Sequence, residues 1–475
     1  MFSKWRQIGL VTVGILVGVM ISINYSAVAQ RSLTPLPVEE MRAFTDVFEA
    51  IKRNYVEPVE DKKLFAEAIN GMLTGLDPHS AYLDQDAFRE LQVGTQGEFG
   101  GLGIEVGMEE GFVKVIAPID DTPASRAGVK AGDLIVKLDD ASVKGMTLTD
   151  AVKRMRGKPN TQITLTIVRK GETKPIVVTL TRAVIKVQSV KAKLLEPGYA
   201  YFRVSQFQEH TGENLAAAIT RLFKENQSAM KGIVLDLRND PGGLLNGAVA
   251  VSAAFLPPGA LVVYTDGRTE DSKMKLSASP ENYLRGRSRD DFLKKLPPEV
   301  KTVPMVVLVN GGSASASEIV AGALQDHRRA VVMGQPTFGK GSVQTILPLG
   351  NNTAIKLTTA RYYTPNGRSI QAKGIVPDIP LDDATVVDKT AGLRLREADL
   401  TKHLTDVTKE KEQAEEKAEA QAAAVKYDFT PAPRPKDVDE KAMRPEPGEI
   451  VSKNDYELNQ AIAFLKSRTL AARVN

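Results

Sequence analysis

Residues 232–243, which read GIVLDLRNDPGG, decide the fold of this chain. The stretch opens with an apolar run and ends in a turn of Pro and Gly. A second run, VPMVVLV, covers residues 303–309. Continuous apolar runs are typical of strands buried on both faces, and apolar residues at helical spacing, such as Leu215, Ile219 and Leu222, precede the first run. We therefore expect an α/β core between about residues 199 and 380. Within it, residues 267–300 are rich in charge, Ser and Pro and are expected to form a mobile excursion.

The segment upstream of this core, residues 97–182, has a different pattern. Apolar residues alternate with polar ones, as in Ile163, Leu165 and Ile167, which predicts short strands with one wet face. A single helix interrupts the strands, with apolar residues at positions 148, 151, 152 and 155. Together these features resemble the outline of a PDZ domain.

Both ends of the chain are predicted to be partly helical. Residues 38–55 carry apolar side chains at helical spacing, and a second helix is expected up to about residue 73. Their apolar stripe would pack against another domain or another subunit. Near the C-terminus, a Lys/Glu/Ala-rich stretch at 409–424 and a Pro-rich linker at 431–435 precede a short amphipathic helix. We expect this helix, whose apolar face includes Leu458 and Leu465, to dock on the core, with a dimer contact as the alternative.

Composition excludes several functional classes. The 475 residues include 62 Lys and Arg against 58 Asp and Glu, so a net charge of +4 gives no reason to expect nucleic acid as a partner. Cysteine is absent, which removes thiol nucleophiles, disulfides and cysteine zinc sites. The four histidines have no metal-ligand spacing, so we expect neither a metal nor a cofactor.

The N-terminus has the features of a secretory signal peptide. Lys4 and Arg6 precede an apolar run at residues 8–23, and Ala27-Val28-Ala29 fits a signal peptidase site. The run is short for a membrane-spanning helix. We expect export to the periplasm and cleavage after Ala29, with a retained inner-membrane anchor as the alternative.

Three serines occupy a corner between a buried strand and a helix, in the segment GGSASASE at residues 311–318. A hydroxyl at such a corner is exposed, and the free N–H groups of the first helical turn can stabilise an oxyanion. Ordinary helix capping by serine is the alternative. One strand later, Lys340 lies between glycines in TFGKGSVQ at residues 337–344. A serine nucleophile needs a base, and a buried lysine with a lowered pKa is the available candidate.

Four segments resemble the C-terminal processing peptidases, which are secreted serine proteases with a PDZ domain. They read SASASEIVAGAL (313–324), FGKGSVQ (338–344), GIVLDLRNDPGG (232–243) and GYAYFRVSQF (198–207), and the resemblance covers roughly residues 40–380. It implies a multidomain α+β chain whose α/β core is ClpP/crotonase-like. It also implies that Ser315 is the nucleophile, Lys340 the general base and Gln344 the amide that orients the lysine.

The resemblance further implies an oxyanion hole made of the Ala316 N–H and one N–H of the turn containing Gly242 and Gly243. Which glycine donates stays open, and an ordinary strand-ending turn is the alternative. In the PDZ-like module, Gly101, Leu102, Gly103 and Ile104 resemble the loop that holds a peptide's terminal carboxylate, with the tail added as an extra strand. These residues could instead serve only a hairpin.

The sequence therefore predicts five regions: a signal peptide at 1–29, a helical region at 30–97, a PDZ domain at 98–183, a Ser-Lys protease core at 184–384 and a helical or linker region at 385–475. The expected function is an exported endopeptidase that captures C-terminal tails of unfolded or tail-bearing proteins. A catalytically dead PDZ scaffold and a hydrolase of small esters are the rivals. We expect a homo-oligomer, and the resemblance makes a tetratricopeptide-repeat lipoprotein adaptor plausible.

Overall fold

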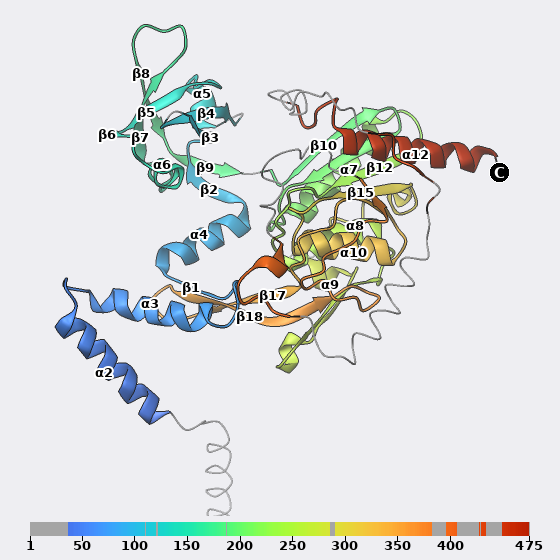
Figure 1. The fold of residues 1–475 in the computed structure, drawn as a ribbon. Helices are drawn as coiled ribbons and strands as arrows, with labels where there is room; N and C mark the ends of the chain where they lie inside the picture. The colour runs from blue at the N-terminus through green and yellow to red at the C-terminus, as the bar shows by residue number, and fades with distance from the viewer. Residues whose placement is uncertain are drawn as a thin grey trace, which may run out of the picture. The chain divides into compact units, whose positions relative to one another are not determined.

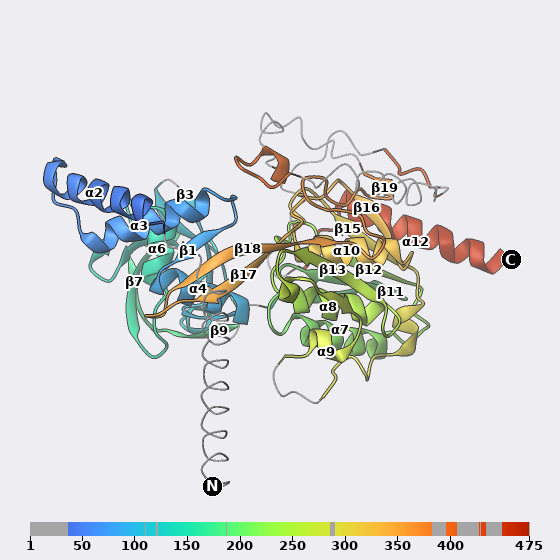
Figure 2. The same ribbon diagram turned by 90° about the horizontal axis from the view of Figure 1, so that it is seen from below.

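The computed structural model describes residues 37–109, 111–119, 122–186, 188–285, 290–381, 396–405, 427, 429–433 and 449–474. The chain forms two compact units, residues 1–71 and residues 72–475. Figures 1 and 2 show the ribbon from two directions. The predicted signal peptide and the charge run at 409–424 lie outside the described residues. No described helix is long and apolar enough to cross a membrane.

Two amphipathic helices form the described part of the first unit, which confirms the helices expected from the apolar spacing. They are α2 (Val38–Asn54) and α3 (Asp61–Thr74), whose last turn runs into the second unit. The ring of Phe65 lies 6.2 Å from that of Phe44 and 4.9 Å from that of Phe48, between ring centroids. Nevertheless α2 has no buried residue, and Met41 is 53% exposed. The apolar stripe of α2 is therefore open to a partner surface.

The PDZ-like module is a small β-rich fold in the second unit. Its sheet has the strand order β3-β4-β5-β7-β8, with β6 beside β5, and a separate pair joins β2 to β9. These elements are β2 (Glu98–Gly101), β3 (Ile104–Glu109), β4 (Phe112–Pro118), α5 (Pro123–Arg126), β5 (Leu134–Leu138), β6 (Ala141–Ser142), α6 (Leu148–Met155), β7 (Gln162–Val168), β8 (Ile176–Thr181) and β9 (Ala183–Lys186). The alternating residues Ile163, Leu165 and Ile167 all point into the core of the module, as the sequence predicts.

A six-stranded sheet forms the centre of the second unit and confirms the expected α/β core. Its order is β10-β11-β12-β15-β16-β19, and all pairs are parallel except β10 with β11. The strands are β10 (Val190–Glu196), β11 (Tyr199–Val204), β12 (Gly232–Asp236), β15 (Met305–Val309), β16 (Val331–Gly334) and β19 (Ile379–Pro380). Every residue of β12 and β15 is buried, because helices cover both faces of the sheet.

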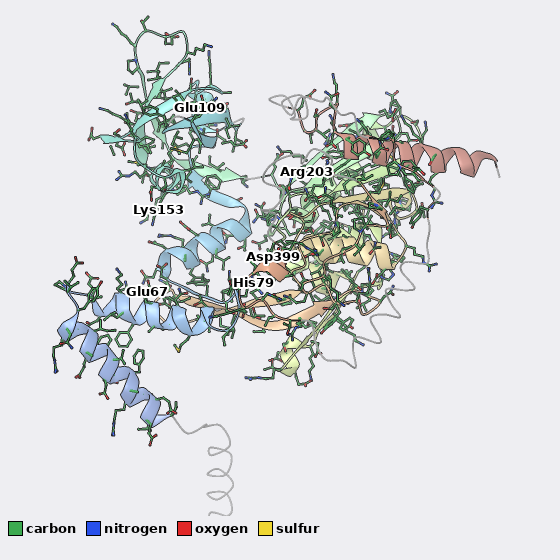
Figure 3. The ribbon with its side chains drawn as sticks, viewed as in Figure 1. Glu67, His79, Glu109, Lys153, Arg203 and Asp399 are labelled. Carbon is green, nitrogen blue, oxygen red and sulfur yellow. The ribbon has the colours of Figure 1, made fainter. Side chains whose placement is uncertain are left out.

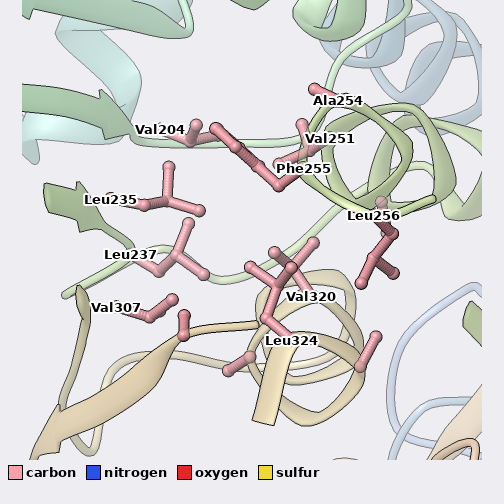
Figure 4. Close-up of a cluster of buried hydrophobic side chains, with 14 of the residues drawn as sticks. Val204, Leu235, Leu237, Val251, Ala254, Phe255, Leu256, Val307, Val320 and Leu324 are labelled. Carbon is pink, nitrogen blue, oxygen red and sulfur yellow. The ribbon is translucent and has the colours of Figure 1, made fainter. Parts of the chain in front are cut away.

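Alternate residues of β12 point to opposite faces of this sheet. Leu235 lies in a cluster with the helices α7 (Thr211–Glu225), α8 (Leu245–Phe255) and α10 (Ala316–Asp326). Figure 4 shows this cluster, with Leu235 and Leu237 near Phe255 of α8 and Val320 of α10. Val234 instead belongs to the cluster on the other face. This two-sided burial explains the unbroken apolar run in the sequence.

A second sheet adjoins the core and includes the strand that follows the lysine segment. It joins β1 (Ala81–Leu83), β18 (Ala354–Tyr363), β13 (Leu261–Gly267) and β14 (Lys275–Ser277), and β17 (Ser342–Pro348) pairs with β18. The helix α4 (Gln85–Gln96) follows β1. The register of β1 on β18, with Ala81 opposite Lys356, places the chain just before the PDZ-like module beside β18, the strand that also pairs with β17.

The expectation of a mobile excursion at residues 267–300 is wrong for most of that segment. β14 pairs with β13, and the helix α9 (Pro280–Tyr283) follows it. The side chain of Tyr283 is buried, and its hydroxyl donates to Asp291 at 2.8 Å. Polar composition suggested a loop, but the pairing with β13 is a contact that local composition cannot predict. Residues 286–289 lie outside the described residues.

The last helix, α12 (Tyr456–Val474), docks on the core, as expected from its apolar face. Leu458 and Leu465 are buried in the cluster on the second face of the central sheet. The turn before α12 is also tied to the segment after β12, because the guanidinium of Arg238 donates two hydrogen bonds to Asp455, at 2.7 and 3.0 Å. The apolar face of α12 is therefore used within the chain.

Candidate active site

The three serines of the 311–318 corner have different environments. Ser313 Oγ donates to the carbonyl of Leu237 at 2.8 Å, and Ser317 Oγ donates to the carbonyl of Asp240 at 2.9 Å; both serines are fully buried. Ser315 is only partly buried and precedes α10 with a φ of 56°. This left-handed conformation is uncommon for a residue with a side chain, and such strain clusters at functional sites. The structure thus separates Ser315 from its two structural neighbours.

Glu318 joins the serine corner to the lysine segment. Its Oε2 accepts hydrogen bonds from the backbone N–H groups of Ser315 at 2.8 Å and Lys340 at 3.0 Å. Its Oε1 accepts from Thr337 Oγ1 at 2.5 Å and from the Gly339 N–H at 2.7 Å. Burial raises the pKa of Glu318 to about 7, against the opposite effect of these four donors. The backbones of Ser315 and Lys340 therefore meet at one carboxylate oxygen, although 25 residues separate them in sequence.

Lys340 has the electrostatic environment of a base. Burial lowers the pKa of its ammonium, and the like charge of Lys356 lowers it further. The carboxylates of Glu397, Glu318 and Asp77 act in the opposite direction. Because the net direction is downward, a neutral amine is more accessible here than at an exposed lysine. A neutral amine can accept the proton of a serine hydroxyl.

Tyr362 of β18 connects the same two residues through its hydroxyl. This hydroxyl donates to the carbonyl of Lys340 and shares a side-chain hydrogen bond with Ser315. Burial raises the pKa of Tyr362 well above its ordinary value, so that the phenol stays protonated. The Ser315 side chain is therefore held against a neutral partner.

The glycine turn lies directly beside Ser315. A methyl group at Gly242 would lie 2.8 Å from both the Ser315 Cβ and the Ala316 nitrogen, so a side chain there would fill the space next to that N–H. The N–H of Gly242 donates to Asp240 Oδ1 at 2.8 Å. Gly243 has a φ of 144° and packs against Phe207, where a Cβ would lie 2.1 Å from the carbonyl oxygen. Both glycines are thus required by close approach of the backbone.

The side chain of Gln344 lies on β17, beyond Lys340. Its Nε2 donates to the hydroxyls of Ser342 at 3.0 Å and Thr358 at 3.2 Å. The Thr358 hydroxyl in turn donates to Asp77 at 3.0 Å. These contacts connect Gln344 to the lysine segment through β17 and β18, and a direct role in orienting the lysine stays a prediction.

Sequence reasoning missed a group of residues that surrounds the lysine segment. His79 and Asp77 belong to the motif LDPHS at residues 76–80, and Glu397 lies in the short helix η4 (Glu397–Asp399). His79 Nε2 lies 2.8 Å from Glu397 Oε2, across 318 residues of sequence. From the sequence, no role is expected for the histidines, and Glu397 falls in the predicted helical or linker region at 385–475. The signal available was the motif itself, which puts two ionisable residues two positions apart around a proline.

The proposed carboxylate loop of the PDZ-like module connects β2 to β3. The Leu102 side chain is buried in the module core, and its carbonyl accepts the N–H of Ala124. Gly103 has a φ of 76°, and a Cβ there would lie 2.2 Å from Thr122. Among the described residues, the strand that begins at Ile104 pairs only with β4, so its other edge is free. A free edge strand after a glycine turn is what β-strand addition by a peptide requires.

Comparisons with known proteins agree with this arrangement. Residues 198–381 match the model of peptidase family S41, residues 100–180 that of the PDZ domain, and residues 21–87 that of the activating protease CtpB N-terminal domain. The chain is 47% identical over 393 residues to a carboxy-terminal-processing protease of Bartonella bacilliformis, which covers 82% of this chain and 86% of that protein. It is 34% identical over 384 residues to a probable CtpA-like serine protease of Staphylococcus aureus, which covers 80% and 73%.

Among solved structures, a photosystem II D1 C-terminal processing protease is similar, with 31% identity and a TM-score of 0.40 over 71% of this chain and 92% of that one. The relative from Bartonella matches over most of its length, at an identity that leaves no doubt of common ancestry. The chain therefore belongs to peptidase family S41 and, within it, to the carboxy-terminal-processing serine proteases.

Proposed function

We propose that this chain is an exported endopeptidase in which Ser315 attacks the peptide bond and Lys340 is the general base. The observation that carries this proposal is the shared oxygen of Glu318, which accepts the N–H groups of both Ser315 and Lys340. The lowered pKa of Lys340 and the strained φ of Ser315 support it further. Peptide binding without cleavage and hydrolysis of small esters have no observation in their favour.

The reaction proceeds in two halves. Lys340 Nζ takes the proton of Ser315 Oγ while Oγ bonds to the substrate carbonyl carbon, and the carbonyl electrons move to its oxygen. The Ala316 N–H donates to this oxyanion. Because the N–H of Gly242 is engaged by Asp240, the N–H of Gly243 is favoured as the second donor. The lysine ammonium then protonates the leaving amine, and water releases the acyl group by the same steps.

Alanine substitution at the three serines tests this assignment. Ser315→Ala should abolish cleavage of an unfolded protein while keeping the melting temperature. Ser313→Ala and Ser317→Ala are the controls. Ser313→Ala loses the bond donated to Leu237 and the one accepted from Asn310, and Ser317→Ala loses a donation shared between the Asp240 and Ala314 carbonyls. Each lost bond costs about 0.5–1.5 kcal/mol of stability, yet both variants should retain turnover. An active Ser315→Ala enzyme would contradict the proposal.

The PDZ-like module is proposed to capture apolar, unstructured C-terminal tails of substrate proteins. The free edge of β3 and the glycine turn at Gly101–Gly103 support this role. Backbone N–H groups of the turn would bind the terminal carboxylate, and the tail would add as a strand. Binding of a fluorescent tail peptide to the Ser315→Ala protein, with and without residues 98–183, measures this capture directly.

The signal-like N-terminus supports export to the periplasm, with cleavage after Ala29. N-terminal sequencing of the protein from the cell envelope would decide between cleavage and a retained anchor. The exposed stripe of α2 supports self-association, and light scattering of the mature chain tests it. A tetratricopeptide-repeat lipoprotein adaptor is a further candidate partner, which a pull-down with the Ser315→Ala protein would detect.

A further inference from the structure

We propose that Glu397, held by His79, is the counter-charge of Lys340. In this role Glu397 is a positioning residue that stabilises the ammonium formed when Lys340 takes the proton of Ser315. The inference rests on the Ser315–Lys340 mechanism proposed above and adds to it the group that compensates the charge of the base.

The Glu397 carboxylate is held in one orientation by its neighbours. Its side chain is completely buried, and Nε2 of His79 lies 2.8 Å from one oxygen and 3.0 Å from the other. Gln371 Nε2 donates to the same carboxylate at 2.9 Å. Figure 3 labels His79 near the β17 and β18 strands and Asp399 of η4 close by. A buried carboxylate with two side-chain donors is fixed in orientation.

Hydrogen bonds connect Glu397 to the lysine segment. Gln371 Oε1 accepts the N–H of Gly341, the residue after Lys340, at 2.9 Å. The backbone N–H of Glu397 donates to the carbonyl of Phe338 at 3.1 Å. Hydrogen bonds therefore join Glu397 to the chain on both sides of Lys340. These contacts hold Glu397 against the backbone of the residues that flank Lys340.

The surroundings of Glu397 determine its charge. Burial alone would raise the pKa of this carboxyl, but the hydrogen bonds from His79 and Gln371 and the nearby charges of His79 and Lys340 bring it below its ordinary value. Glu397 is therefore ionised at neutral pH. Its negative charge favours the protonated form of Lys340, as does that of Asp77 and, above its own pKa of about 7, that of Glu318.

Lys356, on β18, has the opposite effect on the pKa of Lys340. The ammonium of Lys356 disfavours the protonated form of Lys340. Around the base there are thus three carboxylates, from η4, α10 and the segment before β1, against one lysine, together with the neutral phenol of Tyr362. Burial and the charge of Lys356 lower the pKa of Lys340, so that its amine can accept a proton, and the carboxylates compensate the ammonium once it has formed.

The chemical role of Glu397 is electrostatic throughout. During acylation one proton passes from Ser315 Oγ to Lys340 Nζ, the Oγ–carbon bond forms, and the carbonyl electrons move to oxygen. The proton then passes to the leaving nitrogen as the carbon–nitrogen bond breaks. Glu397 gains and loses no proton. It lowers the free energy of the states in which a buried ammonium faces a negative oxyanion, because an unpaired buried charge is costly.

Opposite shifts in the pH profile test the proposal. The kcat/KM of a short chromogenic peptide should rise with pH as free Lys340 loses its proton. Glu397→Gln should move this rise to lower pH and reduce kcat about ten- to a hundredfold, as expected for loss of a charge-assisted contact. Lys356→Met should move the rise to higher pH. A merely structural role would lower the plateau without moving the rise in either direction.

His79 offers a matched pair of variants. Gln at position 79 keeps a donor for the carboxylate, whereas Leu does not, so His79→Gln should retain most activity and His79→Leu should resemble Glu397→Gln. If Glu397→Gln fails to fold, Glu397→Asp can replace it, because aspartate keeps the charge and should keep the wild-type pH profile. The Lys356→Met and His79 variants then still test whether the counter-charge role is correct. An unchanged profile in both Glu397→Gln and Lys356→Met overturns the inference.

The Lys340→Arg variant separates the counter-charge role of Glu397 from the catalytic roles of Ser315 and Lys340. If Lys340→Arg is inactive but the pH profile of kcat/KM is the same in the wild type, Glu397→Gln and Lys356→Met, only the counter-charge role is lost. If Lys340→Arg retains turnover, Lys340 is not the base, and the mechanism itself falls.

Discussion

Replacing Glu318 by glutamine tests how one buried carboxylate holds the catalytic corner together. The carboxylate accepts four hydrogen bonds, two on each oxygen. A glutamine can place its amide oxygen on only one side and must turn its NH₂ group toward the other. If the NH₂ group lies on the side of Ser315 and Lys340, it faces two backbone donors. On the other side it would face the Gly339 N–H and the Thr337 hydroxyl, which can rotate and accept.

The second orientation is the better one, and it leaves a single buried N–H, that of Gly339, without an acceptor. An unsatisfied buried donor costs about 1–3 kcal/mol. Alanine at position 318 would leave all three backbone N–H groups without an acceptor, which would lower the free energy of unfolding by about 3–9 kcal/mol. That cost is of the order of the whole stability of a domain, roughly 5–15 kcal/mol. We therefore expect Glu318→Gln to fold with reduced stability and Glu318→Ala to lose its active fold.

Denaturant unfolding and turnover of an unfolded substrate, measured on the same preparations, check this expectation. Glu299→Gln, at an exposed carboxylate, is the matched control and should behave as the wild type. The reasoning is refuted if Glu318→Gln is as stable as this control, or if Glu318→Ala remains active.

Three further predictions concern the base, the tail site and the last helix. Lys340→Arg should be as inactive as Lys340→Ala, because a guanidinium keeps its proton at any usable pH; turnover by the arginine variant would point to another base. Amidation of a substrate tail should raise the concentration needed for half-maximal cleavage about ten- to a hundredfold, through loss of about 1.5–3 kcal/mol, and equal cleavage of both tails would remove carboxylate capture. Asp455→Asn should lower the free energy of unfolding by about 1–3 kcal/mol, because Arg238 loses a bidentate partner, whereas the exposed Asp271→Asn should have no effect. Deletion of residues 454–475 should therefore destabilise the core, which thermal unfolding would detect.

The central fold was predictable because its signal is local. The apolar runs of β12 and β15 read as buried strands, and the alternation in β7 reads as a half-exposed sheet. By contrast, β14 and α9 were missed because their order comes from pairing with β13. Polar composition carries no information about such a partner.

The candidate site was predictable only in part. Local sequence could not choose among Ser313, Ser315 and Ser317, because the difference lies in hydrogen bonds to the carbonyls of Leu237 and Asp240, in the segment that follows β12. The choice of Ser315 came from the family resemblance. The pairing of His79 with Glu397 joins positions 318 residues apart, and no spacing rule reaches that far.

Reaction with a fluorophosphonate tests the central claim most directly, because this reagent bonds only to an activated serine. The labelled protein would be digested and the modified residue located by mass spectrometry, in the wild type and in Lys340→Arg. We predict a single adduct on Ser315 that forms faster as pH rises, and no adduct in Lys340→Arg. An adduct on another serine, or equal labelling of Ser315 in both proteins, would contradict the account.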